Sequence, residues 1–228
     1  MARLNVRDYL KDIHKGQDIY VIASGASMDY VDPSFFEGKI TIGLNQTFSK
    51  YKYCTYYLRK DGRGWMGFDV IDHINNVSPQ SKLIVSDYVG CALEWGKNDF
   101  GDDIGFDYYY FDHPTGHGEL DTSVLPKILP EAIFPNGVSL TSIGIAMAAY
   151  MGAKNIIVCG NDTVLVDGKD YFKEYTQSYK KPQDHVPDLN WGSPQSEIVT
   201  KYLRELGINI VGFNPWINFR LEGHRCSL

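Results

Sequence analysis

The hydrophobic pattern of this chain consists of short apolar runs, several of them rich in β-branched residues, separated by turns or by segments with helical spacing. β-Branched residues favour strands, and strands that alternate with helices favour a parallel sheet joined by right-handed crossovers. The pattern therefore predicts an α/β fold with a mainly parallel sheet flanked by helices. The predicted strands are Asp18–Ala23, Lys39–Leu44, Tyr53–Leu58, Lys82–Val89, Asn155–Cys159 and Asn209–Phe213.

Apolar residues at helical spacing mark several of the segments between these strands. A C-terminal helix is predicted to begin at Ser193, which can act as the N-cap, with Pro194 in the first turn and Gly207 after the last turn. The other predicted helices are Arg3–His14, Gly64–Asn76 and Ser142–Met151.

Two polar segments interrupt the alternation. Glu94–Leu120 is rich in Gly, Asp, Tyr and His, and its aromatic run Phe106–Phe111 favours one extra strand, folded over the sheet edge or over the site. Asp167–Asn190 is a second, Tyr-rich excursion. Long loops often carry function, so 94–120 and 167–190 are candidate lids on a single domain that spans residues 1–228.

Composition limits the classes of function. The 228 residues carry a net charge of −6, which argues against nonspecific binding to nucleic acid or to an anionic membrane. The longest small and apolar run, Ile143–Met151, is too short to span a bilayer, and no secretion signal precedes the first strand. The widely spaced cysteines show no CxxC pattern, which indicates a reducing compartment. We therefore expect a cytoplasmic protein with no integral membrane segment.

Polar turns follow two of the predicted strands. Gly160-Asn161-Asp162 comes directly after Asn155–Cys159, and the small-residue turn Ser24-Gly25-Ala26-Ser27 follows the first strand. Ligands bind at the carboxyl ends of the strands in open α/β sheets, so these turns predict a nucleotide-type site. The N–H groups of the small-residue turn would approach a phosphate; alternatively, the turn only requires a positive φ at Gly25.

Two further sets of polar residues fit the same edge of the sheet. Asn45 follows Lys39–Leu44 and either presents its amide to a ribose or base or bonds its own backbone. Ser139, Thr141 and Ser142 lie near the start of a predicted helix, where hydroxyl and N–H groups favour an anion. The alternative is ordinary N-capping by Ser139 or Thr141.

Acidic and histidine side chains raise the question of a metal. Asp162 either holds a sugar hydroxyl or, with Asp167 and Asp170, forms a candidate Mg²⁺ site. A turn at Asp167-Gly168 explains that part of the pattern without a metal. His113 and His117, with Asp112, form a second candidate set, but the Pro and Gly between the histidines favour a loop without metal. No residue is therefore assigned as a metal ligand.

His185 is the candidate general base. It lies in the second excursion together with Tyr171, Tyr175 and Tyr179. A histidine on a mobile loop can accept a proton from a substrate, although the alternative is that it is only solvated. The chain contains no Gly-x-Ser-x-Gly or His-Glu-x-x-His motif, so neither a serine hydrolase nor a zincin is indicated.

Three segments taken together resemble a known family: Tyr20–Met28 (YVIASGASM), Gly43–Gln46 (GLNQ) and Gly152–Asp162 (GAKNIIVCGND). They are similar to the bacterial sialyltransferases that decorate lipooligosaccharide. They are equally similar to motility-accessory-factor glycosyltransferases and to 6-hydroxymethylpterin pyrophosphokinase-like proteins. The order and spacing of the segments extend over nearly the whole chain. The resemblance implies a single Rossmann-like domain with a lid.

The resemblance also implies roles for individual residues. CMP-sialic acid would lie across the strand ends, with the turn Ser24–Ser27 facing the nucleotide, Asn45 contacting the donor and the helix start at Ser139–Ser142 lining the pocket. His185 would act as the base on the acceptor hydroxyl, and Tyr171 would bond the departing phosphate. The position of the family's second tyrosine falls near Val164, and the family's usual Asn-Gly-Pro-Ser-Leu turn here lacks the Asn and the Pro.

The residues and the resemblance together suggest three candidate functions. The first is a glycosyltransferase with a nucleotide-sugar donor of the CMP-sialic acid type and a glycan acceptor, which acts in surface glycan synthesis and requires no cofactor. The second is a Mg²⁺-dependent pyrophosphokinase with Asp162 as the metal ligand. The third is a non-catalytic nucleotide- or glycan-binding domain of the same fold. The Tyr-rich insertion is either a contact in a homo-oligomer or an acceptor platform.

Overall fold

The computed structural model describes residues 4–59, 77–86, 107–112, 120–135, 139–162, 165–175 and 186–213. The helix predicted at Gly64–Asn76 lies outside these residues, as does most of the predicted 94–120 insertion.

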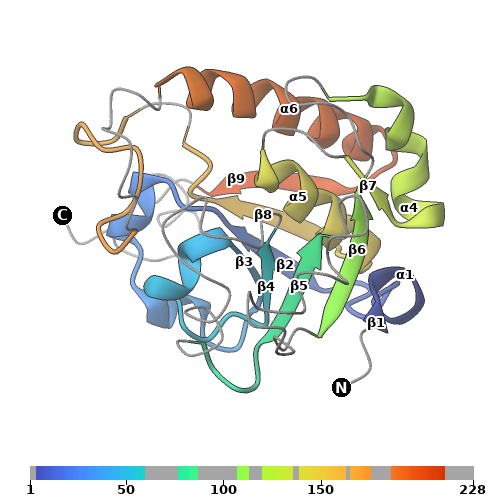
Figure 1. Ribbon diagram of the computed structural model, residues 1–228, viewed down its shortest axis with the longest axis horizontal. Coiled ribbons are helices and arrows are strands. Elements are labelled where there is room, and N and C mark those ends of the chain that lie inside the picture. The colour runs from blue at the N-terminus through green and yellow to red at the C-terminus, as the bar shows by residue number, and fades with distance from the viewer. Residues whose placement is uncertain are drawn as a thin grey trace, which may run out of the picture.

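Within the described residues the strands form one nine-stranded sheet in which every strand pair is parallel (Figure 1). The strand order is β1-β6-β5-β4-β3-β2-β8-β9, with β7 beside β6. The chain therefore proceeds from β2 to β6 in one direction and places β8 and β9 on the other side of β2. The strands are β1 Leu4–Asn5, β2 Asp18–Ile22, β3 Ile40–Leu44, β4 Tyr56–Arg59, β5 Lys82–Ser86, β6 Tyr108–Asp112, β7 Ile133–Phe134, β8 Asn155–Cys159 and β9 Asn209–Phe213.

Hydrophobic residues on alternate sides of the strands build two cores. Ile19 and Val21 of β2 belong to one buried cluster, and Tyr20 and Ile22 belong to the other. The first cluster packs under α5 (Leu140–Tyr150), and the second packs under short 3-10 helices. The 3-10 helices are η1 Ala26–Tyr30, η2 Pro33–Phe36 and η3 Asn45–Ser49, and the remaining helical segments are α1 Val6–Tyr9, η5 Thr122–Lys127, α4 Ile128–Glu131 and α6 Val186–Glu205.

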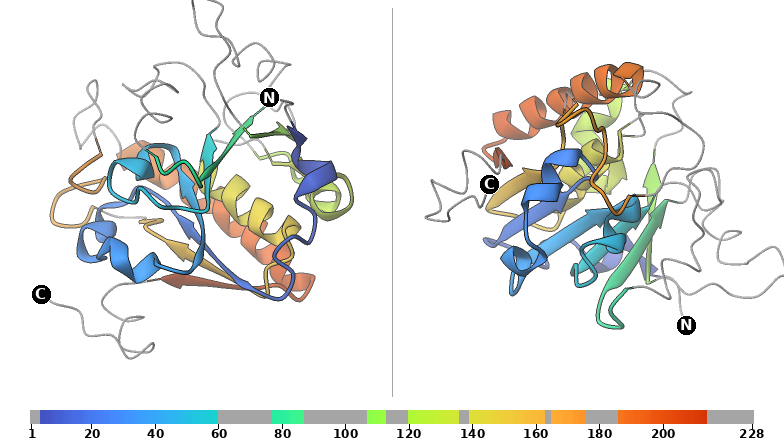
Figure 2. Two further views of the ribbon diagram at one scale, coloured as in Figure 1. Left: turned by 90° about the horizontal axis from the view of Figure 1, so that it is seen from below. Right: turned by 90° about the vertical axis from the view of Figure 1, so that its left-hand side faces the viewer.

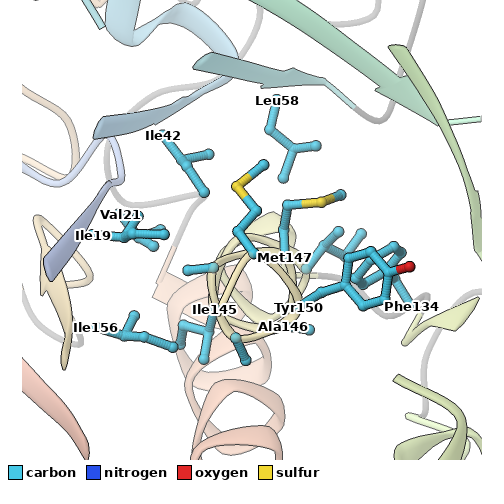
Figure 3. Packing of buried hydrophobic residues seen from close by; sticks show 14 of the residues in the cluster. Ile19, Val21, Ile42, Leu58, Phe134, Ile145, Ala146, Met147, Tyr150 and Ile156 are labelled. Atoms are coloured by element: carbon cyan, nitrogen blue, oxygen red, sulfur yellow. The ribbon is translucent and has the colours of Figure 1, made fainter. Parts of the chain in front are cut away.

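Helix α5 is buried along its whole length. A helix that is apolar or small on all sides is stable only where both faces are covered. The sheet covers one face, where Met147 lies toward Leu58 of β4 and Ile145 lies beside Ile156 of β8 (Figure 3). Helix α6 lies beside α5 and covers the other face (Figure 2). Among the described residues, none of the helices combines the length and the apolar composition that a membrane span requires.

The N-terminal prediction of a helix over Arg3–His14 is wrong in extent. Only Val6–Tyr9 is α-helical, and it is capped by the Asn5 side chain, which accepts from the Arg7 N–H at 2.8 Å. The backbone beyond α1 turns away because its N–H groups bond the loop after α5 instead: His14 N–H donates to the Met151 carbonyl at 2.9 Å. Tertiary hydrogen bonds thus replace the last turns of the predicted helix.

Other segments also differ from prediction: the strand predicted at Tyr53–Leu58 is Tyr56–Arg59, and the helix predicted at Ser142–Met151 is Leu140–Tyr150. The aromatic run Phe106–Phe111 was expected to fold over the sheet edge or the site, but β6 lies inside the sheet between β5 and β1. Helix α6 begins at Val186, so Ser193 lies within it and is not its N-cap, and the 167–190 excursion is already helical at its end. In contrast, β8 and β9 have the bounds predicted for them.

Candidate functional site

The carboxyl ends of β2 and β8 meet where the strand order reverses. Ile22 pairs with Cys159, and beyond them the Ala23 N–H donates to the Cys159 carbonyl at 2.8 Å. The Gly25 N–H then donates to the Gly160 carbonyl at 2.8 Å. The two turns predicted as a nucleotide site therefore leave the sheet side by side. Such a switch point is the usual ligand crevice of an open α/β sheet.

Gly25 is required by close packing rather than by its backbone angles. Its φ is −62°, an ordinary value for any residue, so the alternative explanation through a positive φ is wrong. A Cβ at this position would lie 2.4 Å from the Gly160 carbonyl oxygen and 2.5 Å from Asp162 Oδ2. Gly160 combines both constraints, because its φ is +65° and its Cβ would lie 2.8 Å from the Ala23 carbonyl oxygen.

Asp162 holds the two turns together. Its Oδ2 accepts from the Ser27 N–H at 2.7 Å, and its Oδ1 accepts from the Ser27 hydroxyl at 2.6 Å. Burial raises the pKa of Asp162 above its ordinary value, although the two Ser27 hydrogen bonds oppose that shift. Because the N–H groups of Gly25 and Ser27 both donate within the protein, the predicted phosphate contact does not hold for these two groups here.

The three aspartates proposed for a Mg²⁺ site, Asp162, Asp167 and Asp170, do not form a metal-binding cluster in the structure. Asp167 (φ +51°) and Gly168 (φ +72°) form the tip of a tight turn closed by paired Val166 and Lys169, and Asp167 accepts from the Tyr30 hydroxyl. The turn explanation for Asp167-Gly168 is therefore confirmed. Asp170 accepts from the Tyr171 N–H at 3.0 Å. Within the described part of the chain, no group of three His, Cys, Asp or Glu side chains is placed to hold a metal.

Tyr171 lies directly beside the small-residue turn. It pairs with Gly25 in an antiparallel bridge, and the Phe172 N–H donates to the Ser24 carbonyl at 3.1 Å. The ring of Tyr171 stacks on Tyr175 with centroids 4.3 Å apart and an interplanar angle of 12°. The long-range contact with the turn joins the second excursion to the site. His185, predicted to act with Tyr171, lies outside the described residues, as does Val164.

Asp29 of η1 also bonds the segment that contains Tyr171. Its carboxylate accepts from the Lys173 N–H at 2.7 Å and from Lys169 Nζ at 3.2 Å. The first contact holds the backbone after Tyr171, and the second holds the Lys169 side chain before it, so both favour the position of Tyr171 beside the turn.

Asn45 directly follows β3, as the first residue of η3, in the left-handed conformation with φ +50°. Asparagine tolerates this region better than most residues, and strained positions of this kind concentrate at functional sites. Since β3 pairs with β2, Asn45 lies at the same sheet edge as the small-residue turn. The side chain is half-buried.

The start of α5 lies over this edge, but its serines face another helix. A Cβ on Gly144 would lie 2.8 Å from Val21 Cγ1 and 3.1 Å from Leu44 Cδ2, so α5 crosses the ends of β2 and β3. The hydroxyls of Ser139 and Ser142 lie 3.2 and 3.4 Å from the Ser196 hydroxyl of α6. Ser139 occupies the N-cap position of α5, as the capping alternative expects, but its side chain makes no cap hydrogen bond. Thr141 is buried.

Sequence reasoning missed two buried polar residues at the same end of the sheet. Arg59 ends β4 and Ser86 ends the described part of β5, and their side chains are 3% and 0% exposed. The strand predicted at Tyr53–Leu58 stopped one position before Arg59. The sequence signal for Arg59 was an arginine directly after an apolar strand, because arginine is almost never fully buried unless it is paired.

Comparison with known proteins gives a result only at the level of structure. No protein-family model matches the chain, and no curated protein matches it in sequence. Among solved structures, the sialyltransferase CstII from Campylobacter jejuni in complex with cytidine-5'-monophosphate matches with a TM-score of 0.51 and 12% identity, over 90% of this chain and 84% of that chain. The chain shares the α/β fold of this sialyltransferase.

Two further structures match less well. The α-2,3-sialyltransferase Cst-I from Campylobacter jejuni has a TM-score of 0.48 and 14% identity over 90% of this chain and 78% of that chain. The sialyltransferase CstII with a trisaccharide acceptor and CMP has a TM-score of 0.48 and 11% identity, over 90% of this chain and 84% of that chain. At these identities the likeness is one of fold.

Proposed function

We propose that this protein is a glycosyltransferase that uses a CMP-linked sugar of the sialic acid type and a glycan acceptor, in the synthesis of surface glycans. The observation that carries the proposal is the joined pair of turns at the ends of β2 and β8, where Gly25 and Gly160 bring the backbones into contact. This edge is the expected ligand crevice of the sheet. The sialyltransferase CstII, whose fold the chain shares, was solved with cytidine-5'-monophosphate.

The proposed reaction is a direct displacement at the anomeric carbon of the donor sugar. The acceptor hydroxyl oxygen forms the new glycosidic bond while the bond from the anomeric carbon to the phosphate oxygen breaks. His185 takes the hydroxyl proton, and the electron pair of the broken bond leaves with CMP. Tyr171 donates a hydrogen bond to the departing phosphate, a role that its position beside the small-residue turn supports.

The direct test is thermal stabilisation of the purified chain by CMP, CDP, UDP, GDP and ATP, each with and without Mg²⁺. A ligand at about a hundred times its dissociation constant adds about 2.7 kcal/mol to stability. We expect a CMP-selective shift that does not require Mg²⁺. An ATP-selective, Mg²⁺-dependent shift would favour the pyrophosphokinase instead. CMP-sugar binding without transfer or hydrolysis would indicate a non-catalytic domain.

Tyr171→Phe is expected to lower the rate of transfer about 100-fold while CMP binding stays within about twofold, because the hydroxyl acts on charge that develops as the phosphate leaves. The ring and its stacking on Tyr175 are retained in this variant. The measurement is kcat with a CMP-sugar donor alongside calorimetric binding of CMP. Tyr53→Phe, at an 84% exposed tyrosine, is the matched control. An unchanged kcat in Tyr171→Phe would remove Tyr171 from the mechanism.

His185→Ala is expected to lower kcat about 100-fold or more with donor binding kept, because the acceptor proton then has no general base. His14→Ala is the control, since His14 bonds the loop after α5 that precedes β8 and so lies at the amino end of the sheet. Single-turnover assays over a pH series separate the loss of a base from a change in binding. Full turnover in His185→Ala would show that another group takes the proton.

A further inference from the structure

Asp29 connects the small-residue turn to the segment that contains Tyr171. It lies in η1, which begins directly after Gly25. Its carboxylate accepts from the Lys173 N–H at 2.7 Å and from Lys169 Nζ at 3.2 Å, 144 and 140 residues away in the sequence. In Figure 2 the orange Tyr171 segment lies beside the blue η1. One side chain therefore bridges two distant parts of the chain at the carboxyl edge of the sheet.

The bond to the backbone is the stronger of the two Asp29 contacts. The Lys169 side chain is 53% exposed, and an exposed ion pair contributes little because water and salt screen it. The Asp29 side chain is only 19% exposed, and a carboxylate that accepts from a backbone N–H forms a charge-assisted hydrogen bond. Loss of the Asp29 carboxylate therefore acts mainly by releasing the backbone at Lys173.

This backbone position lies within the stretch that sets where Tyr171 lies. Tyr171 and Phe172 pair with the small-residue turn, and Tyr175 stacks its ring on that of Tyr171. Lys173, which Asp29 holds, comes between these two points of contact. The junction of the two turns, in contrast, is formed by other bonds, so removal of Asp29 leaves it in place.

We propose that Asp29 is a positioning residue for sugar transfer, which holds the Tyr171 hydroxyl at the place where the donor phosphate departs. This inference rests on the proposed function and adds a residue to it. Asp29 acts through Tyr171 and touches neither the donor nor the acceptor. A catalytic group displaced by about 1 Å loses up to about 100-fold in rate, so loss of the Asp29 contact lowers kcat and leaves nucleotide binding intact.

The test measures release of CMP from CMP-N-acetylneuraminic acid, which reports departure of the phosphate whether the sugar passes to a glycan or to water. It compares Asp29→Ala and Asp29→Asn, each in the unmodified protein and combined with Tyr171→Phe. Calorimetry gives the CMP dissociation constant, and hydrogen exchange follows the Lys173 amide. Asp32→Ala is the matched control, because Asp32 also accepts from a backbone N–H, that of Ser34 at 2.8 Å, but within η2.

We expect Asp29→Ala to lower kcat about tenfold and to speed exchange at Lys173 about tenfold, with the CMP dissociation constant within about twofold. Asp29→Asn keeps an oxygen that accepts from the Lys173 N–H, so its kcat stays within about threefold. Asp32→Ala leaves kcat and this exchange unchanged. Combined with Tyr171→Phe, Asp29→Ala lowers kcat no further, because the hydroxyl that Asp29 positions is already gone.

Four results would overturn the inference. An unchanged kcat in Asp29→Ala gives Asp29 a structural role only, and the proposed function stands. A loss of CMP binding as large as the loss of kcat would show that Asp29 supports the nucleotide site instead. Losses that add in the combined variant would show that Asp29 acts independently of Tyr171. If the unmodified protein releases no CMP from the donor, the proposed function fails and this inference fails with it. If Asp29→Ala does not fold, Asp29→Ser, with its shorter side chain, decides by the same criteria.

Discussion

Gly25→Ala is expected to destabilise the protein by about 3 kcal/mol or more and to abolish nucleotide binding. The added methyl group would lie 2.4 Å from the Gly160 carbonyl oxygen, which is a backbone atom held by β8. Relief requires the two turns to separate, which breaks the Gly25–Gly160 hydrogen bond. For a chain of this length the loss corresponds to a Tm about 6–12 °C lower. Thermal unfolding with and without CMP measures both effects.

Gly212→Ala is the matched control for this prediction. Gly212 lies in β9, and a Cβ there would meet nothing within 4 Å. Alanine in a strand loses less conformational entropy than glycine on folding, so stability is expected to be unchanged or slightly higher. Equal Tm values for Gly25→Ala and the unmodified protein would show that the turns separate without cost. The packed junction between them would then not hold the site.

Asp162→Ala is expected to cost about 2–3 kcal/mol at neutral pH, because it removes both hydrogen bonds to Ser27 and leaves the Ser27 N–H without its acceptor. Asp162→Asn is expected to stay within about 1 kcal/mol of the unmodified protein, since an amide oxygen can accept from the same N–H. Urea unfolding of the three proteins separates the hydrogen bonds from the charge. A loss in Asp162→Asn as large as in Asp162→Ala would mean that the negative charge itself holds the turns.

The burial of Asp162 also predicts a pH dependence. Its folded-state pKa is raised above the ordinary value of 3.8, so the folded state binds the proton more tightly than the unfolded state. The associated stabilisation is complete below 3.8 and is lost as the pH rises through the raised pKa. The stability of the unmodified protein relative to Asp162→Asn should therefore fall as the pH rises across this range. A difference that grows with pH would contradict the burial argument.

Local sequence was sufficient for the bounds of β8 and β9. Asn155–Cys159 and Asn209–Phe213 have the bounds expected for apolar, β-branched segments. For β8 the reason is that a parallel strand buried on both faces needs a continuous hydrophobic run. The helix predicted at Ser142–Met151 is likewise present, over Leu140–Tyr150. The turns at Ser24–Ser27 and Gly160–Asp162 were recognisable as a pair because each follows such a strand.

The roles of individual polar residues depended on contacts between segments distant in sequence. Asp162 was predicted to hold a metal or a sugar hydroxyl, but it accepts two hydrogen bonds from Ser27. Ser139 was predicted to cap α5 or bind an anion, but its hydroxyl faces Ser196. A local pattern reports that a side chain can donate or accept. It does not report which partner comes within reach after folding.

By itself, the sequence determined an α/β fold, its central strands and the edge of the sheet at which a ligand site belongs. These features follow from hydrophobic periodicity and from the chemistry of single turns, which act over a few neighbouring residues. Only the tertiary structure decided the strand order, the close contact at Gly25 and the position of Arg59 beside Asn45. Those features depend on which strands pair and in which register, and register is set by packing across the whole sheet.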